Sequence, residues 1–230
     1  MAKHIRYMLR FMCGRFILSD ASWAEYHDTL RIIRGASGHV SYNIKPTQTV
    51  SLARIVDGRL RADEARWWFV PDWFDVGTRD WKATTFNARI ETAASKPVFR
   101  RAWKRGRCIL PASGYYEWTG DRSARRPWFV GLTQNAPVFF AGLCEARSDS
   151  ALTCTILTRE ATPELGHLHP RMPVILTEDE LLPWLSGETG DADGRDLGLG
   201  WSGRFVTRPV RPFGRDDDGP ELIEQDGFDL

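Results

Sequence analysis

Six short strand-like runs lie between residues 107 and 176, at spacings typical of a β-rich domain. They cover residues 107–110, 114–118, 128–132, 138–144, 152–158 and 173–176. Two further runs, 49–55 and 59–69, flank Asp57-Gly58, and Asp-Gly is a favoured two-residue hairpin turn. The chain is therefore limited to folds with a substantial β-sheet component, including at least one hairpin.

Helical segments are expected at both ends of this strand-rich region. Residues 13–18 suggest a short strand, after which Asp20 can cap a helix that carries Tyr26 and other apolar residues on one face and stops at 35–38. Two short helices are expected after Asn87, and others at about 160–168 and 178–185. The stretch 186–200 suggests a loop, and 215–230 a loose acidic tail. The fold class predicted is α+β.

Composition argues against a membrane or secreted protein. The 230 residues contain 42% apolar side chains, enough for a sizeable core, but no run of about 18 uncharged apolar residues. Arginines interrupt the N-terminal run 5–12, so neither a membrane span nor a secretory signal fits, and a cytoplasmic protein without a membrane partner is expected. Four cysteines without a Cys-x-x-Cys pair favour free thiols over disulfides or a zinc site.

The net charge of +1 conceals an asymmetry. Residues 1–177 hold 26 Lys and Arg against 16 Asp and Glu, whereas residues 178–230 hold 5 against 14, so the two parts carry +10 and −9. Within the first part, residues 96–107 carry six cations and no acid, with Phe99 and Trp103 interleaved. This run suits phosphate contacts beside stacking surfaces, or equally a solvated helix face whose aromatic side chains point into the core.

Four separated segments hold reactive groups that could form one site: Cys13, Asn87, Glu117 and His169. Together they supply a soft nucleophile, an amide that can hold an oxygen, and two groups that move protons near neutral pH. Each residue alone is weak evidence for a site. A lone histidine, for example, is more often structural than catalytic. Glu117 lies between two aromatic residues, so it is either solvated by alternation or buried with a raised pKa.

The other cysteines have a simpler interpretation. A lone cysteine in an apolar strand is usually a small buried hydrophobe, and this is expected of Cys108, Cys144 and Cys154.

Seven blocks in family order make the chain similar to the SOS response-associated peptidase (SRAP) family, whose members recognise abasic sites in single-stranded DNA and cross-link to them. The blocks are Met-Cys-Gly-Arg-Phe at 12–16, Tyr-Asn-Ile-Lys-Pro-Thr-Gln at 42–48, Arg-Trp at 66–67 with Pro-Asp-Trp at 71–73, Asn-Ala-Arg-Ile-Glu-Thr at 87–92, Arg-Cys at 107–108 with Pro111 and Gly-Tyr-Tyr-Glu-Trp at 114–118, His-x-Arg-Met-Pro at 169–173, and Gly-Pro-Glu-Leu-Ile at 219–223.

The resemblance implies one β-rich domain over residues 13–224, with mixed and antiparallel sheets in a barrel-like core flanked by short helices. Residues 1–12 would be an N-terminal extension and 225–230 a short tail. The block at 219–223 is an ordered closing segment in that family, which overrules a loose tail. The resemblance implies no metal or organic cofactor and no obligatory protein partner. A DNA-bound protein would be associated with the nucleoid.

The resemblance also assigns roles. The thiol and a free α-amine of Cys13 would trap the opened abasic sugar as a thiazolidine, and ring closure would gain from the proximity of both nucleophiles. Asn87 would hold the opened sugar, Glu117 would relay protons, and His169 would assist ring opening.

DNA contacts follow from the same resemblance. Arg15 and Arg89 match phosphate-binding arginines, and Pro46, Trp73 and Phe74 match residues that pack against the flanking bases. From the residues alone, Trp73 could be core, and Arg89 could pair with Glu91 or another acid.

The sequence departs from the family at its N-terminus, because twelve residues precede Cys13 and make its nitrogen an amide. Three explanations are open: translation starts at Met12, which is the one favoured, the extension is removed by autoproteolysis, or the protein does not cross-link. Trp68, where the family usually has glycine, and Pro170 are smaller departures. Two other functions stay open: a thiol peptidase with Cys13 as nucleophile and His169 as base, and a non-catalytic single-stranded nucleic-acid-binding module.

Overall fold

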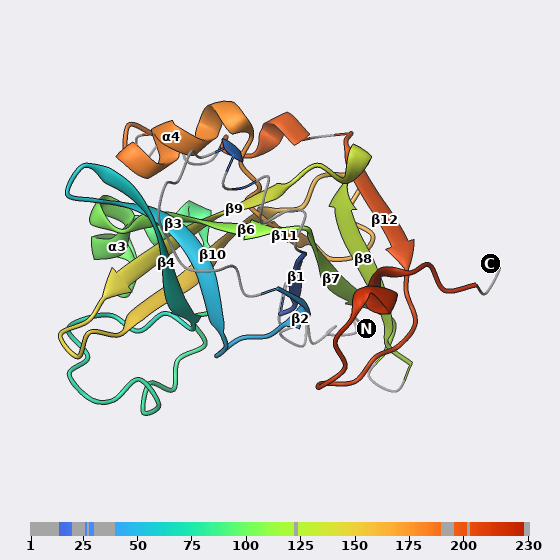
Figure 1. Cartoon of the computed structure of the whole chain (residues 1–230), viewed down its shortest axis with the longest axis horizontal. Coiled ribbons are helices and arrows are strands. Elements are labelled where there is room, and N and C mark those ends of the chain that lie inside the picture. The colour runs from blue at the N-terminus through green and yellow to red at the C-terminus, as the bar shows by residue number, and fades with distance from the viewer. Residues whose placement is uncertain are drawn as a thin grey trace, which may run out of the picture.

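The computed structural model describes residues 14–19, 26, 28–29, 40–121, 124–189, 196–201 and 203–227. Its strands form two sheets (Figure 1). The predicted hairpin is confirmed as β3 (Thr49–Val56) and β4 (Arg59–Trp67), which pair antiparallel along their whole length. Both turn residues have left-handed backbone angles, with φ of 50° at Asp57 and 71° at Gly58, as the favoured two-residue turn requires.

Five strands close into a ring, which confirms the barrel-like core. The order is β3, β4, β10 (Leu152–Glu160), β9 (Val138–Ala146) and β6 (Arg107–Ala112), and β6 pairs back to β3. The long strand β10 continues beyond the ring, where β5 (Asn87–Arg89) and β11 (Arg171–Pro173) pair with it. The pairs of β10 with β4 and with β5 are parallel, so the sheet is mixed.

The second sheet is antiparallel, in the order β12-β8-β7-β1-β2. Its strands are β1 (Phe16–Leu18), β2 (Ser41–Ile44), β7 (Gly114–Thr119), β8 (Arg126–Leu132) and β12 (Phe205–Pro209). The strands β2, β5 and β12 were not expected from the sequence. Each is short, and its pairing partner is distant in sequence.

Three apolar clusters fill the molecule. The inter-sheet core lies between the ring and the second sheet and includes Phe16, Trp67, Tyr115 and Phe140. A second cluster packs the helices against the ring, with Trp103 among its buried members. The third lies on the outer face of the second sheet and consists of Ile17, Tyr116, Phe129, Val210 and Leu222.

The helices are short: α2 (Ile90–Ala93), α3 (Arg100–Arg105) and α4 (Glu178–Ser186). The two helices expected after Asn87 and the one at 178–185 are confirmed. The helix expected at 160–168 is wrong, because residues 163–168 form successive turns. Pro163 and Gly166 interrupt any regular helix there, and the turns close on the carbonyl of Thr162.

Several other expected segments have different bounds or structure from those predicted. The strand expected at 173–176 begins and ends earlier, as β11, and Ile175 makes only an isolated bridge to Phe140. The tail is not loose: η4 (Pro220–Ile223) is a 3-10 helix that buries Leu222, as the resemblance implied. η3 (Leu199–Trp201) lies at the end of the expected loop 186–200, and a third short turn, η1 (Thr133–Asn135), follows β8.

Some expectations fall outside the described residues. They are most of the helix after Asp20, of which residues 26, 28 and 29 are described and helical, and Cys13 at the start of the first expected strand. Among the described residues, no helix is long and apolar enough to cross a membrane.

Candidate active site

Glu117 lies in the middle of β7 with its side chain toward the inter-sheet core. Tyr115 belongs to that core and Tyr116 to the outer cluster, so alternation places Glu117 on the same face as Tyr115. Its side chain is only 4% exposed. The buried interpretation of this carboxyl group is therefore correct and the solvated one is wrong.

His169 lies in the segment that covers the edge of this core, and it is 6% exposed. Its Nδ1 lies 3.0 Å from the backbone nitrogen and 3.1 Å from the carbonyl oxygen of Arg171, so this ring atom is held against the backbone of Arg171 in either tautomer. Trp128 is the cross-strand partner of Glu117, and its ring lies 6.2 Å from that of His167. These contacts bring the histidine segment beside the face of the sheet that carries Glu117.

Asn87 begins β5, in register with Ile156 of β10. Ile156 belongs to the inter-sheet core, so Asn87 faces that core as well, from the opposite sheet to Glu117. Arg171 ties α2, which directly follows β5, to the histidine segment, because its guanidinium donates to both carboxylate oxygens of Glu91, at 2.5 and 2.8 Å. Burial is the largest influence on the pKa of Glu91 and would raise it, but the hydrogen bonds from Arg171 and from the backbone, with the charges of Arg171 and Arg89, together lower it. Glu117 and Asn87 thus face one core from opposite sheets, and the segment that carries His169 lies beside it.

The fourth, Cys13, lies outside the described residues. Its neighbour Gly14 begins the described chain, and the backbone of Arg15 accepts a hydrogen bond from Tyr116 N at 3.0 Å. Phe16 pairs with Tyr115, so the same antiparallel register places Gly14 opposite Glu117.

The two expected phosphate-binding arginines differ in surroundings. Arg15 donates to Asn43 Oδ1 at 2.7 Å and lies over the rings of Trp118 and Phe213, each 5.7 Å away. Burial lowers the pKa of Arg15 from its ordinary value, and the nearby charge of Arg215 lowers it further. Arg89 is exposed at the end of β5. The alternative in which it pairs with Glu91 is wrong, since Glu91 makes its ion pair with Arg171.

The expected base-packing residues lie on two loops. Pro46 is half-buried in the turn between β2 and β3. Trp73 and Phe74 lie on the loop after β4, and Trp73 is 59% exposed, so its interpretation as a core residue is wrong. Both rings contact Trp81, with centroids 5.7 and 5.0 Å away. Trp68 is half-buried with its ring 5.5 Å from that of Phe86, directly before Asn87.

The three other cysteines are buried in the ring, as expected. Burial raises the pKa of Cys108 and of Cys154 well above the ordinary range, so these thiols are poor nucleophiles. No group of three His, Cys, Asp or Glu side chains within the described ranges could hold a metal ion.

Sequence reasoning missed two residues whose side chains support the site. Asn43 donates from Nδ2 to the carbonyls of Gly214, Arg215 and Asp217, which holds the C-terminal segment against Arg15. Arg147, whose side chain is 2% exposed, donates to the carbonyls of Pro71, Phe74 and Val76 and holds the loop that carries Trp73. The only sequence signal for Asn43 was its place in a family block, and nothing marked Arg147.

Comparison with known families gives one match. Residues 12–211 match the family described as SOS response associated peptidase (SRAP). Among curated proteins, the chain is 34% identical over 240 residues to abasic site processing protein YoqW of Bacillus subtilis, covering 93% of this chain and 99% of that protein. It is 30% identical over 228 residues to abasic site processing protein YedK of Escherichia coli, with the same two coverages.

Solved structures give the same fold. A protein from Bacteroides thetaiotaomicron superposes with a TM-score of 0.75 at 20% identity, covering 93% of this chain and all of the other.

Proposed function

The chain belongs to the SOS response associated peptidase family, and on this premise we propose that it captures abasic sites in single-stranded DNA as a covalent thiazolidine on Cys13. The observation that supports the proposal best is that Glu117 and Asn87 face one core from opposite sheets, with the segment of His169 beside it and Gly14 two residues before β1. These are a carboxyl, an imidazole and an amide, the groups that opening a sugar and forming an imine require.

The chemistry proceeds in two bond-forming steps. The α-amine of Cys13 adds to the C1 aldehyde of the opened abasic sugar and loses one water to form an imine. The thiol then adds to the imine carbon, and its proton passes to the nitrogen, which closes a five-membered thiazolidine. Because both nucleophiles belong to one residue, the second step is intramolecular and gains effective molarity.

The site residues have separate tasks in this proposal. Glu117 lies opposite Gly14 in the register of β7, where it can move protons to and from the carbinolamine formed at Cys13. His169, whose Nδ1 is held against the backbone of Arg171, acts as the acid for opening the sugar ring. Asn87 holds the opened sugar by hydrogen bonds from the opposite sheet.

DNA flanking the lesion is held by charge and by stacking. Arg15 and Arg89 contact phosphates, while Pro46, Trp73 and Phe74 pack against bases. The exposure of Trp73 supports this role, since an aromatic face open to solvent can stack on any base.

The proposal needs a mature chain that begins at Cys13. The family match begins at residue 12, which supports initiation at Met12 followed by removal of that methionine. The alternative is self-cleavage before Cys13. The two routes differ in one measurement, because Cys13→Ala in the chain beginning at Met1 abolishes self-cleavage but has no effect on initiation at Met12.

The test is the intact mass of protein made from Met12, after incubation with a uracil-containing single-stranded oligonucleotide and uracil glycosylase. We expect a stable adduct equal to protein plus abasic oligonucleotide minus one water. Cys13→Ala keeps the α-amine, so its imine should be seen only after borohydride reduction. Cys108→Ala, a change at a buried thiol, should leave the adduct in place. Absence of an adduct from protein that begins at Cys13 contradicts the mechanism.

A further inference from the structure

Within the basic run at 96–107, the helix α3 turns its aromatic side chains inward and its cationic side chains outward. Phe99, Ala102 and Trp103 are 5, 2 and 2% exposed and pack in the cluster between the helices and the ring. Arg107 of the same run is buried against the rings of Trp103 and Trp184, whereas the four cations of the helix are exposed: Arg100, Arg101, Lys104 and Arg105. The aromatic side chains therefore cannot stack on bases, whereas the cations are available to a partner.

These cations are not explained by the stability of the helix. Arg100 and Lys104, and likewise Arg101 and Arg105, are like charges four residues apart, an arrangement that destabilises a helix. Arg100 also lies in the first turn, where cations are unfavourable and where this helix has no acid. Among the described residues, only Arg101 of the four is ion-paired, with Asp72 and Glu145. Three cations thus remain for a ligand of opposite charge.

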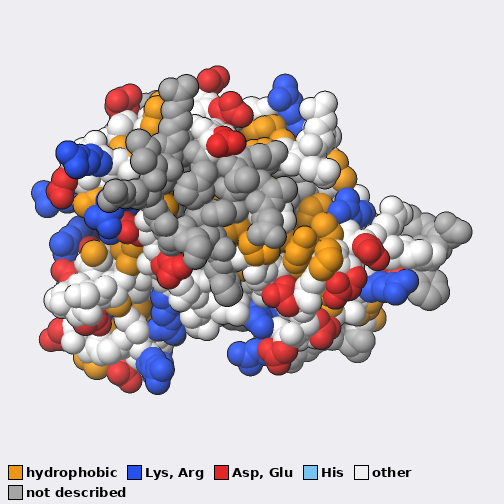
Figure 2. Space-filling view, viewed as in Figure 1, with side chains coloured by type: hydrophobic (Ala, Val, Ile, Leu, Met, Phe, Trp, Pro, Cys, Tyr) orange, Lys and Arg blue, Asp and Glu red, His pale blue; other side chains and the backbone are white. Residues whose placement is uncertain are grey.

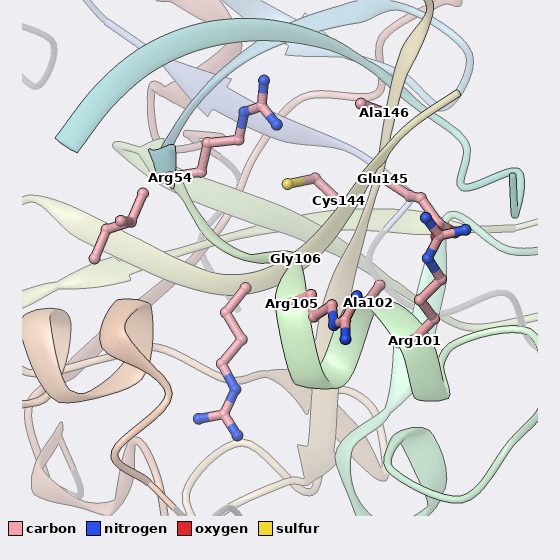
Figure 3. A pocket seen from close by; sticks show the side chains of 10 residues that line it. Arg54, Arg101, Ala102, Arg105, Gly106, Cys144, Glu145 and Ala146 are labelled. Atoms are coloured by element: carbon pink, nitrogen blue, oxygen red, sulfur yellow. The ribbon is translucent and has the colours of Figure 1, made fainter. Parts of the chain in front are cut away.

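A hollow beside the helix is lined by further arginines, of which Arg54 is paired with Asp63 and Arg107 lies against two tryptophan rings. Its volume is about 190 Å³, and four of its lining residues are arginines from β3, α3 and β6 (Figure 3). Arg101 turns toward Glu145 of β9, its partner at 3.2 Å. The lining arginines are Arg54, Arg101, Arg105 and Arg107. Lys and Arg side chains also gather along the left edge of the molecule, the side on which α3 lies (Figure 2).

The hollow and the histidine segment lie at different positions along β10. Cys154 pairs with Cys144, which lines the hollow, and Glu160 pairs with Arg171, two residues after His169. These two positions on β10 are about 20 Å apart at the rise of a β-strand, whereas Ile156, the partner of Asn87, is only two residues beyond Cys154. The aromatic loop, which carries Trp73 and Phe74, contacts the helix, since Asp72 of that loop pairs with Arg101 at 2.9 Å.

We propose that the exposed face of α3, with the adjoining hollow, is a second DNA-binding surface that holds the phosphodiester backbone of the strand beyond the bases stacked on the aromatic loop. The inference rests on the proposed function in that both concern single-stranded DNA. The surface can still be tested separately, because binding of intact single strands requires no abasic site. A phosphate backbone fits better than an acidic protein, because the aromatic loop next to the helix offers a stacking surface for bases.

The test is the salt dependence of binding to an intact 20-nucleotide single strand, measured with Arg100→Gln/Lys104→Gln. Glutamine is a good helix former, and the change removes one repulsive pair, so the fold should be retained. Loss of two phosphate contacts should reduce the slope of log K against log salt by about 1.4. The matched control is Arg204→Gln/Arg211→Gln. These two exposed arginines lie on either side of β12, and their replacement should leave the slope unchanged.

Two further readouts separate this surface from the lesion chemistry. The adduct with a five-nucleotide abasic strand should form as in the unmodified protein when the protein is in excess, because bond formation at the lesion does not involve the cations of α3. The proposal is overturned if the α3 variant keeps the full slope, or if the control variant loses as much. If the α3 variant loses slope while no adduct forms with any protein, the surface stands and the cross-linking mechanism fails.

Discussion

Two regions of the molecule use polar side chains in opposite ways. At the candidate active site, Glu117 and His169 are 4 and 6% exposed and are carried by a short strand and an irregular segment. At the hollow, the cations of α3 are exposed on a regular helix. Proton transfer needs groups held in one geometry away from water, whereas attraction of a phosphate backbone acts through solvent and tolerates mobile side chains. The two proposals thus divide capture and holding between these two regions.

The largest expected effect is at the candidate active site. Glu117→Gln keeps the size of the side chain but removes the proton relay, so adduct formation should slow by about 10²-fold or more. The rate is followed by intact mass over time, with thermal unfolding as the control for the fold. Intact single-strand binding should be unchanged. A variant that cross-links at the normal rate would mean that Glu117 is structural only.

Arg147 directly follows Ala146, which lines the hollow, and its loss should act through stability. Arg147→Met leaves three loop carbonyls without their charged donor and should lower the free energy of unfolding by about 3 kcal/mol in a denaturant titration. Arg61→Met, a change at an arginine with a 54% exposed side chain, should cost less than about 0.5 kcal/mol. Equal losses in the two variants would show that the loop is not held by Arg147.

Trp73 tests whether stacking occurs at all. Trp73→Ala should weaken binding of an intact single strand by about 1–3 kcal/mol, the range for one stacked base, without a change in unfolding. Leu182→Ala on α4 is the matched control, because Leu182 is 60% exposed against 59% for Trp73. Binding should fall only in the first variant, and a similar loss in both would point to a nonspecific effect.

The smallest effect is a pH dependence next to α3. The hydrogen bond from Arg101, followed by that from Ser148 N, holds the pKa of Asp72 below its ordinary value. A carboxyl group with a lowered pKa stabilises the fold fully above its unfolded pKa of about 3.9 and loses this contribution as pH falls through the folded pKa. Arg101→Gln should raise the pKa of Asp72, as seen by carboxyl carbon NMR. An unchanged titration would show that the contact is not maintained in solution.

Local patterns in the sequence predicted the strands of the ring well, and distant pairings less well. The Asp57-Gly58 turn and the apolar runs after residue 107 carry their own signals. The strands β2, β5 and β12 have three to five residues each, and they become strands because distant partners pair with them. Alternation alone could not place Glu117, since the face that is buried depends on which sheet lies opposite.

The site residues were proposed from a family resemblance, and local reasoning left each of them open. Arg147 shows why: its importance comes from three carbonyls more than 70 positions away in sequence. No periodicity or composition carries such information. Arg15 is similar, because its surroundings come from Asn43 and Phe213.

The attachment of the first strand to the last segment has a consequence for synthesis. Arg15 donates to the carbonyl of Gly214, which is 199 positions later, and Ile17 packs in one cluster with Val210 and Leu222. A chain still emerging from the ribosome lacks these partners, so its leading strand cannot take its final place until translation is almost complete. The strand β1 is therefore made early and completed late, and a prematurely terminated product would lack the support that this strand requires.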